Sequence, residues 1–314
     1  MKYTTIESDS LDATKYKLLV SALGFESRST AVSEKLAHKT ENRIALGFDH
    51  NLTCSYSRNL SWFKENDFQV ISEISAEKFS GVFEHEVGKF LNERSEQDAT
   101  VKIAIDISCF DRRRMAEILQ FLLSNKSPNI EIDFWYCIGK FQPPQNELSR
   151  NEVAGPIHKK YTGRFTEPGK PLALVAGLGY EPGRVMGAAE YLQASTVVAF
   201  LPQSPISEYF EVVKTSNKTM LEEIEQRRTL DYDVTDPGRL IATLDSIIRG
   251  LNDKHNIILL PGGPKIFALC ALIAGTLNRQ VGVWRVSSCA SLNPNDVESS
   301  GVFLGLRLSS HTDD

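Results

Sequence analysis

The chain has 314 residues, of which 41% are hydrophobic and 24% charged, a balance typical of a soluble globular protein with room for two domains. Its net charge of −5 and pI near 5.8 argue against a surface built for long nucleic acid, which normally carries a broad basic face. No apolar run approaches the roughly 18–20 residues of a membrane span, and the N-terminus lacks the apolar stretch of a signal peptide.

In the first half, short apolar runs rich in β-branched residues alternate with helical patterns. The predicted strands lie near 17–23, 43–48, 68–72, 101–106 and 130–138. The predicted helices lie near 29–38, 55–66, 80–95 and 111–124. Almost continuously apolar strands are expected where helices cover both faces of a sheet. The alternation therefore predicts a mainly parallel sheet in a three-layer α/β unit.

The second half repeats this order. Its predicted strands lie near 171–177, 196–201, 230–234, 255–260 and 280–287, and its predicted helices near 183–193, 205–227, 236–252 and 264–277. Residues 141–170 contain Pro143-Pro144 and Gly155-Pro156 without an apolar period, which indicates a linker with a short β excursion. We therefore expect domains at 1–140 and 171–314, the latter with a possible last strand at 301–308.

The two halves are similar in sequence at two separate places. KLLVSALGFESRSTAVSEKL (17–36) matches LALVAGLGYEPGRVMGAAEYL (172–192), and IAIDISCFDRRRMAEILQFLL (103–123) matches IILLPGGPKIFALCALIAGTL (257–277). Both pairs are separated by 154–155 residues. A near-constant offset indicates internal duplication. The sequence thus predicts two tandem Rossmann-like units.

The motif PGGPK at 261–265 follows an apolar strand and opens an apolar helix. Pro261 begins it, and Gly262 and Gly263 allow main-chain amides to approach a ligand without interference from a Cβ atom. The positive end of the helix dipole points at the same place, and Lys265 can contact a phosphate or a polar base edge. The simpler alternative is a tight strand–helix turn with a surface lysine. The spacing of a Walker A loop is absent.

Two similar loops follow the first strand of each half. GFESR contains Gly24, Phe25, Glu26 and Arg28, and GYEPGR contains Gly179, Tyr180, Glu181 and Arg184. In each loop the aromatic ring can stack on a base and the arginine can contact a phosphate. Each glutamate can accept from a base amino group or pair with its neighbouring arginine. Recurrence in both halves favours function, because an exposed local ion pair contributes little stability.

DISCFDRRR at 106–114 is the counterpart of LPGGPKIFA. Asp106 ends a buried strand, Ser108 occupies a glycine position, and Arg112 and Arg113 enter the helix. One or two of its arginines can point toward a ligand, while another faces solvent because successive helical positions fan around the axis. Asp106 can orient an arginine or a ligand hydroxyl; local capping is the alternative.

All four loops follow strands of predicted parallel sheets. The carboxyl ends of such strands form the usual ligand edge of open α/β sheets. The glycine-rich and cationic loops differ, so we expect an asymmetric pocket between the halves.

Cysteine and histidine spacing gives no metal motif. Five cysteines occur without a CxxC pair: Cys54, Cys109, Cys137, Cys270 and Cys289. Their odd number indicates reduced core thiols in a cytoplasmic protein. The six histidines form no HxxxH pair, so we expect no metal and no cofactor.

LLPGGPKIFALCALIAG resembles the strand–GGTK–helix motif of the CARF family, the Rossmann-like sensory domains of CRISPR-associated proteins. DISCFDRRR is similar to the family's variant ending in Asp-x-Ser/Thr before a basic helix, and 24–28 and 179–184 stand where its first-strand ligand loop would lie. Tandem CARF-like units also form SAVED domains, so the resemblance spans about 17–290. It implies binding of a cyclic oligonucleotide or related nucleotide in a cleft between two units. Here Pro264 replaces the usual threonine, and the first unit lacks both glycines.

Three functions remain open. The favoured one is a sensor that binds a nucleotide signal and controls a separate effector protein, plausibly in antiviral defence. The second is a metal-independent ring nuclease or a nucleoside glycosidase or transferase, with Glu26 or Glu181 as general base or stabilising carboxylate and with Arg184 and Lys265 holding phosphate. The third is a structural subunit with a degenerate nucleotide fold. The sequence leaves open whether the chain forms a homodimer.

Overall fold

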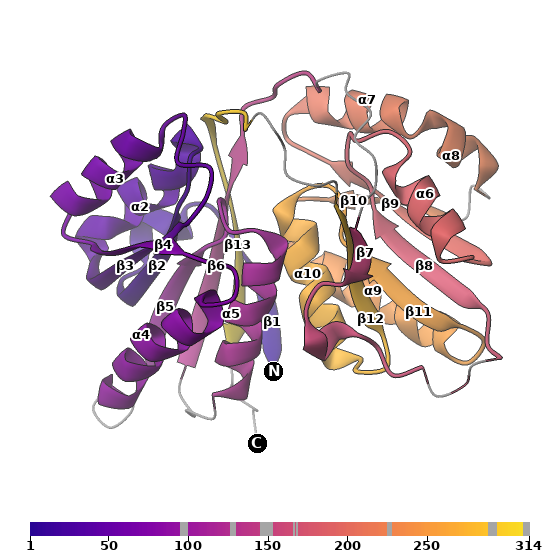
Figure 1. Cartoon of the computed structure of the whole chain (residues 1–314), viewed down its shortest axis with the longest axis horizontal. Coiled ribbons are helices and arrows are strands. Elements are labelled where there is room, and N and C mark those ends of the chain that lie inside the picture. The colour runs from indigo at the N-terminus through magenta and orange to yellow at the C-terminus, as the bar shows by residue number, and fades with distance from the viewer. Residues whose placement is uncertain are drawn as a thin grey trace. The chain divides into compact units, whose positions relative to one another are not determined.

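The structure is a computed structural model that describes residues 1–94, 100–125, 130–144, 153–165, 167, 169–224, 228–287 and 294–309. The chain divides into two compact units. The first comprises Met1–Lys140 and Leu292–Asp314, and the second comprises Phe141–Ser291. Both are α/β units with a mainly parallel sheet between helices, as the sequence predicts (Figure 1).

The first unit contains a seven-stranded sheet in the order β1-β13-β6-β5-β2-β3-β4. Its strands are β1 (Lys2–Ile6), β2 (Tyr16–Leu23), β3 (Thr40–Phe48), β4 (Gln69–Ile74), β5 (Val101–Asp106), β6 (Ile130–Gly139) and β13 (Ser299–Ser309). Its helices are α1 (Ser10–Ala13), α2 (Ala31–Leu36), α3 (Tyr56–Glu65), α4 (Phe79–Arg94) and α5 (Arg112–Ser124), with 3₁₀ turns η1 (Ser27–Thr30) and η2 (Ala37–Lys39). The strands from β2 to β6 pair in parallel, whereas β13 is antiparallel to both β6 and β1.

The second unit contains a six-stranded sheet in the order β10-β9-β8-β11-β12-β7. Its strands are β7 (Val153–Pro156), β8 (Leu172–Gly177), β9 (Thr196–Gln203), β10 (Thr229–Asp233), β11 (Asn256–Leu260) and β12 (Gly282–Ser287). Its helices are α6 (Arg184–Tyr191), α7 (Ser207–Ser216), α8 (Lys218–Glu223), α9 (Pro237–Asn252) and α10 (Lys265–Leu277), with a 3₁₀ turn η3 (Lys159–Tyr161). All pairs are parallel except that of β12 with β7.

The two units share one topology. Numbered in chain order, the five parallel strands of each sheet lie in the order 3-2-1-4-5. In each unit an antiparallel strand then adds beside the fifth, β13 beside β6 and β7 beside β12. The duplication read from the sequence therefore extends to the strand order, including the point at which that order reverses.

The unit boundary predicted after residue 140 is confirmed, but other parts of the chain are assigned differently. The C-terminal strand β13 belongs to the first unit, because it pairs with β6 and β1 rather than extending the second sheet. The short β excursion predicted within 141–170 is confirmed as β7, but it is part of the second unit, because it pairs with β12 at the edge of the second sheet. The strand β1 and the short helix α1 were not predicted, and the helix expected at 205–227 is divided into α7 and α8.

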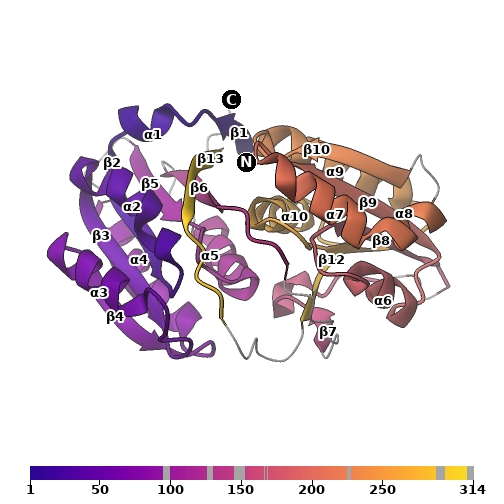
Figure 2. The same cartoon turned by 90° about the horizontal axis from the view of Figure 1, so that it is seen from above.

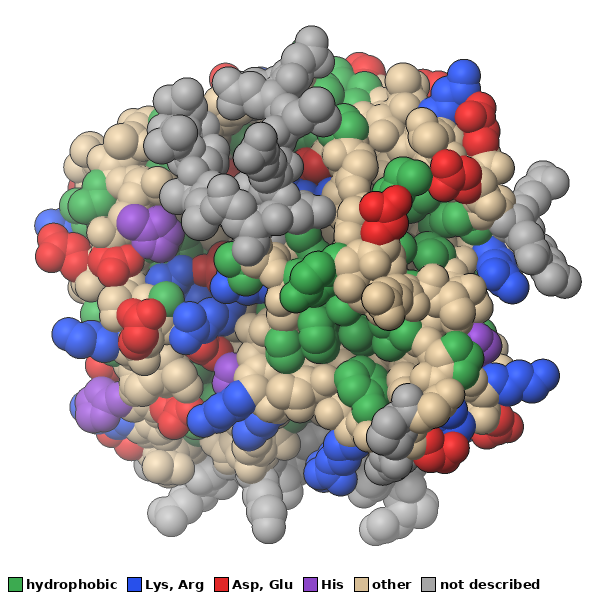
Figure 3. All heavy atoms as spheres, turned by 45° about the vertical axis from the view of Figure 1, so that its right-hand side comes forward, with side chains coloured by type: hydrophobic (Ala, Val, Ile, Leu, Met, Phe, Trp, Pro, Cys, Tyr) green, Lys and Arg blue, Asp and Glu red, His purple; other side chains and the backbone are tan. Residues whose placement is uncertain are grey.

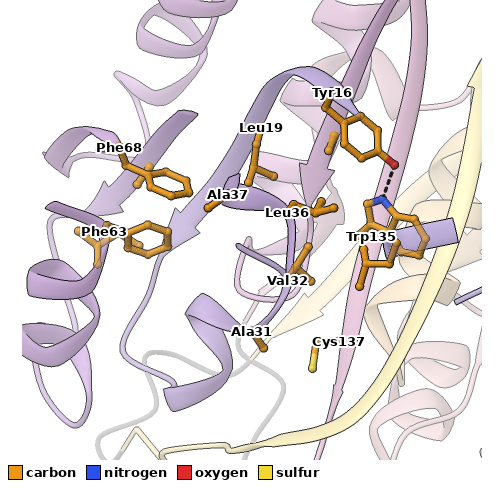
Figure 4. Close-up of a cluster of buried hydrophobic side chains, with 14 of the residues drawn as sticks. Tyr16, Leu19, Ala31, Val32, Leu36, Ala37, Phe63, Phe68, Trp135 and Cys137 are labelled. Carbon is orange, nitrogen blue, oxygen red and sulfur yellow. Dashed lines mark hydrogen bonds between the residues drawn. The ribbon is translucent and has the colours of Figure 1, made fainter. Parts of the chain in front are cut away.

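Hydrophobic side chains fill the space between each sheet and its helices. In the first unit, Leu19 of β2 packs with Val32 and Leu36 of α2, Phe63 of α3 and Trp135 of β6 (Figure 4). This cluster places α2 and α3 on the same face of the sheet (Figures 1 and 2).

A similar core lies in the second unit. Val185 of α6 and Val213 of α7 pack there on Leu174, Ala199 and Ile258 of the sheet. Partly buried hydrophobic side chains adjoin this core, and Figure 3 shows hydrophobic side chains gathered on the face that it brings forward. None of the helices in the described part of the chain is long and apolar enough to cross a membrane.

Candidate functional site

The strand order reverses once in each sheet, between neighbouring strands that point the same way. In the first unit these are β2 and β5, and in the second they are β8 and β11. In open α/β sheets, ligands bind outside the carboxyl ends of the strands at this reversal. The four loops selected from the sequence are those that follow these four strands, so the fold brings each unit's two loops together at its reversal point.

In the second unit, the loops after β8 and β11 are packed backbone on backbone. A Cβ atom on Gly262 would meet the carbonyl oxygen of Gly177, and one on Gly263 would meet the carbonyl oxygen of Leu178. A Cβ on Gly179 would lie 3.0 Å from the nitrogen of Gly263. Gly263 also has φ of +68°. The two loops can approach this closely only because positions 179, 262 and 263 are glycine.

This packing changes the role expected for the PGGPK glycines. The space beside their missing side chains is filled by the loop after β8. The amide of Gly262 donates to the carbonyl of Leu260 at 2.9 Å. The prediction that the Gly262 amide is offered to a ligand is therefore wrong. These glycines position the residues around them, with Pro261 buried at the end of β11.

The loops after β8 and β11 together form a corner of the second unit. Several predicted ligand side chains remain accessible at this corner. Tyr180 is 40% exposed. Arg184 begins α6 and contacts Glu181 at 3.2 Å, and their side chains are 21% and 42% exposed. Lys265 begins α10 and is partly exposed. The local ion pair considered from the sequence thus exists, but it lies at the surface, where screening by solvent makes it weak and leaves both groups accessible to a ligand.

An asparagine that the sequence reading missed supports the first loop in each unit. In the second unit, the amide of Asn217 donates to the carbonyl of Gly179 at 2.7 Å. In the first unit, Asn59 of α3 donates to the carbonyl of Gly24 at 2.9 Å and to that of Glu26 at 2.9 Å. Each asparagine is buried and follows the second parallel strand of its unit. Their separation of 158 residues, close to the duplication offset, was the signal available in the sequence.

The first loop of the first unit is turned inward. Arg28 is only 8% exposed, its Nε lies 2.5 Å from Oε2 of Glu26, and its Nη1 donates to the carbonyl of Cys137 at 3.0 Å. The guanidinium also lies over the ring of Tyr136. Phe25 packs against the hydrophobic core. The prediction that Phe25, Glu26 and Arg28 face a ligand is therefore not met, because the protein itself uses these groups.

The second loop of the first unit is also used internally. Asp106 is buried and its Oδ1 accepts from the amide of Ser108 at 2.9 Å, while the Ser108 hydroxyl accepts from the amide of Cys137 at 2.8 Å. The local-capping alternative for Asp106 thus describes the contact found. A Cβ on Gly24 would lie 3.0 Å from the Cβ of Cys109, so this corner is closed by side chains where the second unit has glycine.

The three arginines at the start of α5 have different surroundings, as expected for successive positions on a helix. Arg114 is buried, contacts Asp111 and lies over the ring of Phe48 at 4.2 Å. Arg113 points along the helix surface to Glu117 at 3.1 Å. Arg112 is partly exposed at the helix start. Arg113 and Arg114 are therefore engaged within the first unit.

The cysteines differ in their surroundings. Among the described residues, Cys54, Cys109, Cys137 and Cys270 are free thiols. Burial raises the pKa of Cys137 and of Cys270, as expected for core thiols. Cys54 is exposed and Cys109 partly exposed, so the core prediction is wrong for them. Cys289 lies outside the described residues. No group of three or more metal-ligating side chains occurs in the ranges that the structure describes.

No family model matches the chain, and no curated protein matches it in sequence. Among solved structures, the chain aligns with a crystal structure of a candidate universal stress protein from Pseudomonas aeruginosa UCBPP-PA14. The alignment covers 88% of this chain and 95% of that one, at 9% identity and a TM-score of 0.26. At this level of similarity the match carries no argument about the site.

Proposed function

We propose that the chain is a cytoplasmic, CARF-like sensor that binds a nucleotide signal, of the cyclic-oligonucleotide type, at the carboxyl edge of the second unit's sheet. Binding there controls a separate effector protein, in antiviral defence. The observation that carries the proposal is the difference between the two edges. The second unit keeps an aromatic, a carboxylate, a guanidinium and an ammonium group partly exposed around the reversal of strand order.

The chemistry of these four groups suits a nucleotide. The ring of Tyr180 can stack on a base, and Arg184 can hold a phosphate through two parallel hydrogen bonds. Lys265 adds a point charge at the N-terminal end of α10, where the helix dipole also favours an anion. Glu181 can accept from a base amino group. Because Gly179 packs on Gly263, the segments that carry these side chains start from the same corner.

Binding is tested by thermal unfolding of the full chain with a panel of linear and cyclic nucleotides. A ligand at a hundred times its Kd stabilises the protein by about 2.7 kcal/mol, which is readily measured. The incubated nucleotide is then analysed by chromatography. Stabilisation with the nucleotide unchanged supports the sensor. Cleavage of the nucleotide would instead make the chain an enzyme, with the exposed Glu181 carboxylate as its first candidate base. If no nucleotide stabilises the chain, the proposal is wrong.

Matched variants locate the site. Arg184→Ala removes an ion pair between α6 and the loop before it, and Arg249→Ala removes an ion pair with Asp245 within α9, away from this edge. Lys265→Ala and Lys218→Ala each remove a lysine from the first position of a helix. We expect Arg184→Ala and Lys265→Ala to abolish the nucleotide shift while leaving the fold intact. The two controls should keep the shift; equal responses from all four variants would contradict the assignment.

A further inference from the structure

We infer that the loop after β2 and the start of α3 form an anion-binding site in the first unit, and that its occupant is the chain's own Asp296 carboxylate, so that this site is closed to a nucleotide phosphate. The inference concerns the first unit alone and holds whether or not the second unit binds a nucleotide. It assigns a ligand class, a carboxylate or phosphate group, to a set of donors around the loop after β2.

Three donors converge on the Asp296 carboxylate. The Ser27 amide lies 2.5 Å from Oδ1, and the Ser27 hydroxyl donates to Oδ2 at 2.6 Å. The Ser55 hydroxyl donates to the same Oδ2 at 2.7 Å. The two serines come from different segments, the loop after β2 and the start of α3, and their hydroxyls lie 3.0 Å apart. Such a set of amide and hydroxyl donors is what a bound carboxylate or phosphate requires.

The electrostatic surroundings favour an anion as well. Ser55 is the residue that caps the N-terminus of α3, a ten-residue helix whose first turn contains no acidic residue. The positive end of the helix dipole therefore faces the carboxylate. Burial acts to raise the pKa of Asp296, but the hydrogen bonds from Ser27 and Ser55 and the nearby Arg58 outweigh it and lower that pKa. The carboxylate is thus held in its charged form.

The segment that carries Asp296 is fastened to the first unit on either side of it. The carbonyl of Val297 accepts from the amide of Arg28 at 3.1 Å, and that of Glu298 accepts from the amide of Lys140 at 2.8 Å. The carbonyl of Pro294 accepts from the thiol of Cys54 at 3.4 Å. Residues 294–298 therefore lie across the loop after β2 in the manner of a strap, with the carboxylate directed into the donors.

The sequence of the second unit does not repeat these donors at the matching position. The duplication offset places Pro182 opposite Ser27. Proline has neither an amide hydrogen nor a hydroxyl, so it removes two of the three donors. The anion set is accordingly a property of the first unit, whereas Tyr180 and Glu181 of the second unit remain exposed.

The test removes the Asp296 carboxylate and supplies a free anion in solution. Asp296→Ala is prepared in the full chain, and its thermal unfolding is followed in acetate and in phosphate against chloride at matched ionic strength. We expect either anion to raise the Tm of this variant by about 2–4 °C, with little effect on the wild-type chain, whose site is filled. Glu298→Ala is the control, because Glu298 lies in the same segment but makes an exposed pair with Lys140.

Two further measurements cover a variant that does not fold and the contribution of a single donor. If Asp296→Ala does not fold in chloride, the yield of folded protein in acetate or phosphate replaces the Tm as the measurement. Adding Ser27→Ala to Asp296→Ala should reduce the response, since it removes one donor. A response to acetate alone would identify a carboxylate site, and a response to phosphate alone a phosphate site. An Asp296→Ala variant that responds to neither anion, or a wild-type chain that responds equally, would overturn the inference.

Discussion

At the scale of single residues, Gly183 and Gly263 differ in what surrounds them although both lie in the second unit's corner. Their φ angles are +70° and +68°, which L side chains rarely adopt. A Cβ on Gly183 would meet nothing within 4 Å, whereas one on Gly263 would meet the carbonyl of Leu178. Glycine is needed at position 183 only for its positive φ, whereas at position 263 it is needed also because a Cβ atom would collide with the Leu178 carbonyl.

Gly263→Ala should therefore destabilise the chain more than Gly183→Ala. The left-handed backbone costs each variant about 1–2 kcal/mol, and only Gly263→Ala adds a collision with backbone that cannot move aside. Chemical denaturation measures both free energies of unfolding. Equal losses of stability would show that the loops after β8 and β11 do not pack as described. We also expect Gly263→Ala to lose nucleotide binding.

The paired asparagines give a second comparison at this scale. Asn217→Ala removes the amide that holds the Gly179 carbonyl, and Asn59→Ala does the same at Gly24. Each substitution should lower the free energy of unfolding by about 1–3 kcal/mol, because a buried carbonyl loses its donor. Asn217→Ala alone should weaken nucleotide binding, as measured by calorimetry. Equal weakening by both variants would contradict a site confined to the second unit.

How far each residue's role could be predicted depended on its surroundings. The sequence placed Gly262 and Gly263 correctly at a strand end, because glycine pairs and apolar runs are local signals. It could not show that the carbonyls of Gly177 and Leu178 fill the space beside them, since that contact joins two separate strands. For the same reason, the sequence could not distinguish Arg28 from Arg184 as a ligand contact. Nη1 of Arg28 donates to the carbonyl of Cys137, which is distant in sequence.

At the scale of elements, the strand β13 is held to the first unit by a buried charged network. Arg307 donates from Nε and Nη2 to the two oxygens of Asp133, each at 2.7 Å, and Asp133 is 1% exposed. Tyr16 of β2 donates to the same carboxylate at 2.7 Å. The Tyr16 hydroxyl also accepts from Trp135 at 3.0 Å (Figure 4). Burial first, and then the Asp133 charge, raise the pKa of Tyr16. A pattern of alternating residues indicates a strand but not the sheet that it joins, so the pairing of β13 with the first unit was not predicted.

Arg307→Met should destabilise the first unit by about 3–5 kcal/mol, because it leaves a buried carboxylate without its cation. Replacing Asp133 by leucine as well should recover part of the loss. Lys140→Met is the control, since it breaks an exposed pair with Glu298 that is worth about 0–1 kcal/mol. Denaturation curves of the three variants check this order, and a loss for Arg307→Met no larger than the control's would contradict it.

The strap also gives a pH dependence. Asp296 has a lowered pKa in the fold, so its contribution to stability is present above the unfolded pKa, near 3.9 for a free aspartate, and is lost as the pH falls through the lower, folded pKa. The free energy of unfolding of the wild-type chain should thus exceed that of Asp296→Asn at neutral pH, and the difference should shrink on acidification. A difference independent of pH would show that the charge is not what Ser27 and Ser55 bind.

At the scale of the whole molecule, one topology is used twice with different results. Both units have the order 3-2-1-4-5 and both place two loops at the reversal. The offset in the sequence was sufficient to predict the duplication. It could not predict that the chain returns to the first unit after Ser291, because a late strand can join any sheet with an open edge. That return brings Asp296 to Ser27 and Ser55 of the first unit and makes the two units unequal.

The most direct test of this account is calorimetric titration of the full chain with the nucleotide that gives the largest thermal shift. We predict one binding event per chain, abolished by Lys265→Ala and retained by Lys218→Ala and by Asp296→Ala. Two equivalent events per chain, or binding that survives Lys265→Ala unchanged, would contradict the claim that the second unit's edge is the ligand site.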